Sequence, residues 1–156
     1  LLRNSHLAVD PKSGGPEIDQ FGRCSDPAYF AAGNLLRPVE TAGWSWQEGR
    51  DAGRAMAQSL IGKMPSSKSE IKVTSLGAGL KYVVPQRIAP TSEETPHRVF
   101  QLRVNRRVRG QIVVRLNGTD IRSIPITALP ERRITLPLSL IPEGSEGEVE
   151  LILRED

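Results

Sequence analysis

Residues 22–34 read GRCSDPAYFAAGN, and the organisation of the first half of the chain depends on this stretch. Residues 29–32, Tyr-Phe-Ala-Ala, form an apolar run that is too short for a helix, with Pro27 before it and Gly33 after it. A short apolar run between turn residues is typical of a strand buried on both faces of a parallel sheet. The sequence therefore predicts a buried strand over residues 29–32. Asn34 would lie at its carboxyl end, where open α/β sheets place their ligands.

This stretch resembles the second flavin fingerprint of the two-dinucleotide-domain flavoproteins. That superfamily includes the pyridine nucleotide-disulfide oxidoreductases, thioredoxin reductase among them, and the FAD subunits of amine and opine dehydrogenases. Its motif is a Thr-Ser-x-Pro turn, a strand that ends in Phe-Ala-Ala-Gly-Asp, and a helix that meets the flavin. Cys24, Ser25 and Pro27 match the turn, with Cys24 in place of the usual Thr. Residues 30–33 match the strand, and Asn34 replaces the usual Asp.

The resemblance, which covers roughly residues 5–62, implies a role in binding FAD. In the family, the residue at the position of Asn34 holds a hydroxyl of the ribityl chain, and an amide can still donate and accept hydrogen bonds there. Residues 38–40 match the start of the helix whose backbone N–H groups point at the pyrimidine edge of the flavin. The cofactor-binding residues that the resemblance implies are Gly33, Asn34, Pro38, Val39 and Glu40.

The first fingerprint of the same family, a GxGxxG phosphate turn, has no match in this sequence. We therefore expect the chain to be the C-terminal part of a longer, cytoplasmic FAD-dependent oxidoreductase and to be inactive alone. The expected partner is the N-terminal FAD- and NAD(P)-binding portion of that parent. The parent would transfer hydride from an amine, opine or nicotinamide donor to the flavin. A homo-oligomer and a separate partner subunit stay open as alternatives.

The composition indicates a globular protein and argues against several other classes. The chain has 156 residues, of which 38% are hydrophobic and 25% are charged. No apolar run approaches the roughly 20 residues that a membrane span needs. The net charge of +3 is too small to drive nucleic-acid binding. With one cysteine and two histidines far apart in sequence, neither an internal disulfide nor a zinc site is expected.

A helix is predicted from about Val39 to Leu60, with Gly62 as its stop signal. Apolar and small residues recur at steps of four and three and predict one buried face. That face would consist of Ala42, Trp46, Gly49, Gly53, Met56 and Leu60. Gly49 and Gly53 each cost about 1 kcal/mol relative to Ala in a helix interior, so we expect another backbone to pack closely against them. The helix would then lie on the flavin-domain sheet; an ordinary core helix is the alternative.

After a polar linker at residues 64–69 the hydrophobic pattern changes to an alternation of period two. Strands are predicted at residues 71–74, 80–84, 100–104, 112–116, 119–124, 134–138 and 149–153. Asn117-Gly118 between two of these runs is a strong hairpin signal. The whole chain is therefore predicted to be α+β. Residues 1–65 would be the C-terminal portion of an FAD-binding domain, and residues 66–156 an antiparallel immunoglobulin- or fibronectin-like β-sandwich.

Four further expectations concern the alternative function, an arginine cluster, residues 130–133 and Cys24. A non-catalytic β-sandwich that mediates domain or subunit contacts is the alternative function. Arginines gather before the hairpin, and they favour a solvated turn or an acidic partner surface over nucleic acid, because only Phe100 is near for base stacking. These arginines are Arg103, Arg106, Arg107, Arg109 and Arg115. Residues 130–133, Pro-Glu-Arg-Arg, resemble a recurrent feature of C-terminal domains in the same flavoproteins. Cys24 is expected to be a packing residue.

Overall fold

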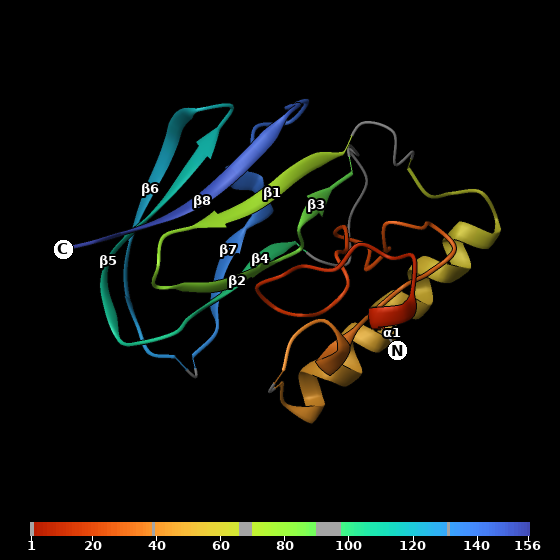
Figure 1. Cartoon of the computed structure of the whole chain (residues 1–156). Helices are drawn as coiled ribbons and strands as arrows, with labels where there is room; N and C mark the ends of the chain where they lie inside the picture. The colour runs from red at the N-terminus through yellow and green to blue at the C-terminus, as the bar shows by residue number, and fades with distance from the viewer. Residues whose placement is uncertain (1, 39, 66–69, 90–97, 131) are drawn as a thin grey trace.

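The computed structural model describes residues 2–38, 40–65, 70–89, 98–130 and 132–156 (Figure 1). Within these ranges the protein is α+β, with one α-helix and two β-sheets. Residues 2–65, called the lead-in below, consist of loops, two short 3₁₀ helices (Leu2–Asn4 and Gly33–Leu35) and the helix α1. Val39 lies outside the described residues, and so do residues 66–69 of the expected linker.

The second part of the chain is a β-sandwich. Its described strands are β1 (Ile71–Leu76), β2 (Leu80–Val84), β3 (Arg87–Ile88), β4 (Val99–Val104), β5 (Val108–Leu116), β6 (Thr119–Ala128), β7 (Ile134–Pro137) and β8 (Glu148–Glu155). One sheet has the order β3-β1-β8-β5-β6 and the other the order β2-β4-β7. The described strand pairs are antiparallel, except that β1 and β8 are parallel. The expected β-sandwich is thus confirmed in its general architecture.

The sandwich core follows from the period-two pattern. Phe100, Leu102 and Val104 on β4 are completely buried, and they pack with apolar residues of β1, β5 and β8. The hairpin between β5 and β6 turns at Asn117 and Gly118, which have φ of 47° and 82°. Asparagine and glycine are the residues that adopt positive φ most easily, so the Asn-Gly prediction is confirmed.

The helix α1 (Ala42–Leu60) ends where the sequence predicts but begins later. The expected start at residues 38–40 is wrong, because Thr41 is the N-cap residue in extended conformation. Gly62 has φ of 71° just beyond the helix, which suits its expected role as a stop. In the part of the chain that the structure describes, no helix is both long and apolar enough to cross a membrane.

The predicted buried face of α1 is also wrong. Trp46, Met56 and Leu60 are 64%, 41% and 88% exposed, and no atom lies within 4 Å of a Cβ built on Gly49 or Gly53. The buried residues are instead Glu48, Ala52 and Ala55, whose mean direction lies roughly 110° around the helix axis from the predicted face. Apolar periodicity could not indicate this, because the residue that fixes the orientation is a glutamate with buried ion-pair partners.

The strand predicted over residues 29–32 is not formed. Phe30 makes one isolated bridge with Arg23, and Tyr29 is half exposed. Ala31 is buried, and its N–H donates to the carbonyl of Gly22 at 2.8 Å. A strand buried on both faces needs neighbouring strands to pair with, and the described chain provides none here. The stretch is a loop that packs against the sandwich.

The lead-in lies against β2 and the segment that follows it. Ile18, Cys24, Ala31 and Leu36 form a small apolar cluster with Tyr82 and Val84 of β2. Phe21 and Ala55 form another with Ala89. The carbonyl of Ile18 also accepts the N–H groups of Gln86 and Arg87, both at 3.1 Å. Figure 1 shows the lead-in gathered at one side of the sandwich, with β5 and β6 at the other.

Candidate functional site

The residues implied as a cofactor site lie together in one loop before α1. Gly33 has φ of 66° and is buried, and a Cβ built on it would be 3.3 Å from Cβ of Ser45 in the first turn of α1. Its N–H donates to Oε2 of Glu48 at 3.0 Å. Asn34 is exposed, and its Oδ1 accepts the N–H of Glu40 at 2.7 Å. The structure therefore brings Gly33, Asn34 and Glu40 together at the entrance to α1.

Glu40 is fixed by three arginines from distant parts of the sequence. Its side chain is only 2% exposed. Oε1 accepts a hydrogen bond from Nε of Arg37 at 3.2 Å and another from Nη2 of Arg103 at 3.0 Å, and Oε2 accepts one from Nη2 of Arg133. Glu40 thus supports the loop from inside, and its carboxylate is not free to contact a cofactor.

Arg37, 1% exposed, joins this carboxylate to a second one in α1. Its Nη2 donates to Oε1 of Glu48 and, at 2.6 Å, to Oε1 of Gln101 on β4. Nε2 of Gln101 in turn donates to Glu48 at 3.3 Å. The lead-in, including α1, therefore meets the sandwich in one buried charged network. We call it the Glu40–Glu48 network, and it consists of Arg37, Glu40, Glu48, Gln101, Arg103 and Arg133.

Glu48 stays ionised in this network. Burial by itself raises the pKa of its carboxyl, but the charge of Arg37 and the hydrogen bonds from Arg37, the Gly33 N–H and Gln101 outweigh burial, so that the pKa lies below the ordinary 4.5. A depressed folded-state pKa means that the stabilisation is complete above the unfolded-state pKa and is lost as the pH falls through the folded-state value. The network should therefore weaken in acid.

We expect the free energy of unfolding to fall below about pH 4.5 more steeply in the unmodified chain than in Glu48→Gln, whose amide does not titrate. Urea unfolding of both chains at a series of pH values between neutral and acidic measures the difference. Carboxyl groups outside the Glu40–Glu48 network have the same surroundings in the two chains and cancel in the comparison. Parallel curves for the two chains would contradict a stabilising Glu48 carboxylate.

Two aromatic side chains border the network. The guanidinium carbon of Arg133 lies 4.1 Å from the ring centroid of Trp44 in the first turn of α1. Tyr82 of β2 is 1% exposed, and its hydroxyl has no hydrogen-bond partner among the described residues. Burial raises the pKa of Tyr82 against the opposing effect of Arg103 and Arg37, so the phenol is neutral at physiological pH.

These contacts show which of the implied residues are exposed and which are bound within the fold. The Asn34 side chain stands at the surface, and an exposed amide in that position suits a sugar-alcohol hydroxyl. Pro38 is exposed as well. Gly33 and Glu40 serve a different purpose: Gly33 lets the loop approach α1, and Glu40 anchors it. The N-terminal end of a 19-residue helix follows, with its partial positive charge.

Sequence reasoning missed most of the network. In the alternating strand at residues 100–104, Gln101 and Arg103 stand between the apolar residues, where side chains usually face solvent, yet they are 4% and 8% exposed. The lead-in covers that face of β4. Arg133 belongs to the Pro-Glu-Arg-Arg stretch, which had no assigned chemistry. No local signal marks such residues, because their partners lie up to 93 positions away.

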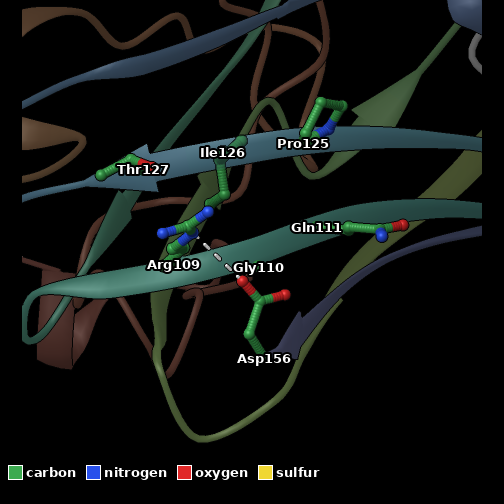
Figure 2. A pocket seen from close by; sticks show the side chains of 7 residues that line it. All are labelled: Arg109, Gly110, Gln111, Pro125, Ile126, Thr127 and Asp156. Carbon is green, nitrogen blue, oxygen red and sulfur yellow. Dashed lines mark ion pairs between the residues drawn. The ribbon is translucent and has the colours of Figure 1, made fainter.

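The arginines before the hairpin do not form one patch. Arg103 points into the Glu40–Glu48 network, whereas Arg106 pairs with Glu155 and Arg115 with Asp120. Nε of Arg109 lies 3.3 Å from Oδ2 of Asp156. This pair borders a hollow of about 300 Å³ on β5 and β6 (Figure 2). The hollow is lined by Arg109, Gly110, Gln111, Pro125, Ile126, Thr127 and Asp156. It lies on the sandwich away from the lead-in, so it has no part in the Asn34 site.

Cys24 is a packing residue, as expected. It is 2% exposed in the cluster with Ile18 and Tyr82. Burial raises the pKa of its thiol, against the lowering effect of Arg87, so it is not a thiolate nucleophile at neutral pH.

No protein-family model, no curated protein and no solved structure matches this chain at a significant level.

Proposed function

We propose that this chain is the C-terminal part of an FAD-dependent oxidoreductase and that it supplies one wall of the flavin site. The position of Asn34 carries the proposal: its side chain is exposed at the end of the flavin-like stretch, and its Oδ1 is bonded to the N–H of Glu40 just before α1. When bound, the flavin supplies the hydride chemistry. The chain itself would hold the ribityl chain at Asn34 and direct the N-terminal end of α1 toward the ring.

The exposed face of α1 supports the same proposal. Trp46, Met56 and Leu60 lie on it, together with Gly49 and Gly53, which have open space where a Cβ would be. A surface of this kind is typical of a face that another part of a protein covers. In a longer flavoprotein, the upstream FAD-binding portion would pack there.

The first test is whether flavin binds to the chain when it is produced together with its upstream reading frame. We expect a protein that retains FAD, detected by the absorbance of oxidised flavin. Asn34→Ala should weaken retention about tenfold, as expected for the loss of one hydrogen bond in a polar site. Asn34→Asp should retain FAD, because its carboxylate can still accept hydrogen bonds from the hydroxyl and from the Glu40 N–H.

Asn4→Ala is the matched control, because Asn4 is an exposed asparagine in the first 3₁₀ helix. A colourless parent, or equal FAD retention in Asn34→Ala and Asn4→Ala, would contradict the proposal. The same experiment distinguishes a flavin site from a general loss of fold, which the far-ultraviolet circular dichroism of each variant reports.

A second prediction concerns the glycines of α1. In the chain alone, Gly49→Ala and Gly53→Ala should each raise the free energy of unfolding by about 1 kcal/mol, because both positions are open and helical. In the longer flavoprotein the same changes should lower stability, because the added methyl groups would meet the backbone that packs there. Gln58→Ala, at another exposed helix position, is the control: its effect on the free energy of unfolding should have the same sign in both proteins. Stabilisation in both proteins would show that nothing approaches this face.

The alternative is a non-catalytic β-sandwich that mediates domain or subunit contacts, and in this chain the sandwich already contacts the lead-in. Tyr82, Gln101 and Arg103 of β2 and β4 are buried, and they meet the lead-in rather than solvent. A sandwich separated from the lead-in would expose these side chains and would leave the Glu40–Glu48 network incomplete.

A further inference from the structure

The sandwich contributes two arginines to the support of the Asn34 loop. Arg103 comes from β4, and Arg133 from the segment just before β7. Both donate to the carboxylate of Glu40, which is nearly fully buried. Arg37 is the third donor and the only one within the lead-in. Two of the three groups that fix this carboxylate therefore belong to the other part of the protein.

The same glutamate is bonded to Asn34 through its main chain. The N–H of Glu40 donates to Oδ1 of Asn34 at 2.7 Å, so the position of the Glu40 backbone sets the rotamer of the asparagine. Because Oδ1 of Asn34 accepts this hydrogen bond, the NH₂ group of the same side chain points away from the Glu40 N–H. A displacement of the Glu40 carboxylate would change which way the exposed amide points.

Arg133 also contacts the helix that follows the loop. Its guanidinium stacks on Trp44 with 4.1 Å between Cζ and the ring centroid, while one of its nitrogens reaches Glu40. A planar guanidinium can make both contacts at once, whereas the compact ammonium of lysine cannot. Arg133 therefore holds the loop and the first turn of α1 in one relative position.

We propose that the β-sandwich is the positioning element of the candidate flavin site, with Arg133 as its main positioning residue. Arg133 sets the geometry of Asn34 through Glu40 and does not touch the cofactor. This inference rests on the proposed function for the identity of the ligand, but the mechanical link from Arg133 to Asn34 is a property of the chain alone. The two parts can be tested separately.

The link is tested in the chain alone by hydrogen exchange of the Glu40 amide. We expect Arg133→Ala to accelerate this exchange about tenfold relative to the unmodified chain, since the hydrogen bond to Asn34 loses its support. Arg133→Lys keeps the charge but loses the planar group that lies over Trp44, and should give an intermediate rate. Arg132→Ala is the control, because Arg132 is the exposed neighbour. The amide of Val114, in the sandwich core, reports global opening in each variant.

Equal acceleration at Glu40 and Val114 would mean that Arg133 only stabilises the fold, and unchanged exchange at Glu40 would remove the link; either result overturns the inference. In the longer flavoprotein, Arg133→Ala should shift the flavin midpoint potential and absorbance relative to Arg132→Ala. A parent without flavin refutes the proposed function but leaves the exchange result to decide the link. A parent that binds flavin with identical potentials in the two variants refutes the positioning role.

Discussion

Replacement of Glu40 by Ala is expected to destabilise the chain by about 3–5 kcal/mol, the cost of leaving buried charges without their partner. Arg37, Arg103 and Arg133 all donate to this carboxylate, and its side chain is 2% exposed. The arginines cannot shed their charge, because a guanidinium keeps its proton in proteins. Urea unfolding measures the change from the shift of the midpoint and the slope.

Glu143→Ala is the control for this prediction. Glu143 is exposed in the loop before β8, so its removal should change stability by less than about 0.5 kcal/mol. An effect of Glu40→Ala no larger than that of the control would mean that the arginines find water or other partners, and that the network does not hold the lead-in on the sandwich.

Phe100→Ala should also have a large effect and is expected to lower the free energy of unfolding by about 3–5 kcal/mol. Phe100 is completely buried in the sandwich core, and its neighbour in sequence, Gln101, belongs to the Glu40–Glu48 network. Truncation removes an aromatic ring near the start of β4 and leaves a cavity in the sandwich core. Because β4 also contacts the lead-in, we expect Phe100→Ala to destabilise the lead-in and the sandwich to the same extent.

The chain allows this coupling to be measured, because Trp44 and Trp46 are its only tryptophans and both lie on α1. Tryptophan fluorescence therefore reports on the lead-in, and the amide signals of β5 report on the sandwich. In Phe100→Ala the two urea transitions should shift together. A fluorescence transition that stays in place while the sandwich unfolds earlier would show that residues 1–65 and 66–156 fold independently.

The strands of the sandwich could be predicted because the sequence patterns that indicate them are local. Alternation along β2, β4 and β8 and the Asn117-Gly118 turn each depend on a few neighbouring residues, and the strands form close to the expected positions. The sequence did not indicate the parallel pairing of β1 with β8, which joins residues more than 70 positions apart. It also did not indicate that β4 is buried on both faces.

The lead-in was predicted less well, and for a different reason. The pattern of residues 29–32 suits a strand between other strands, but among the described residues it has only the single bridge between Arg23 and Phe30, and a loop results. The apolar stripe of α1 was read as its buried face, whereas Glu48 and its ion pairs turn that stripe to the surface.

The candidate site residues also include some that a local motif indicates and some whose contacts only the structure reveals. Gly33 and Asn34 were identified from their motif, and the structure places them beside the start of α1. Glu40 was identified for its place near a helix N-terminus, but its carboxylate is committed to three arginines. Ion pairs across long sequence separations leave no local trace, and only the three-dimensional arrangement reveals them.

The most direct measurement is a crystal structure of the proposed longer flavoprotein with FAD added. Our account predicts a ribityl hydroxyl of FAD within hydrogen-bond distance of the Asn34 side chain, with Glu40 still paired to Arg37, Arg103 and Arg133. A flavin bound elsewhere, with Asn34 in contact only with solvent, would contradict it.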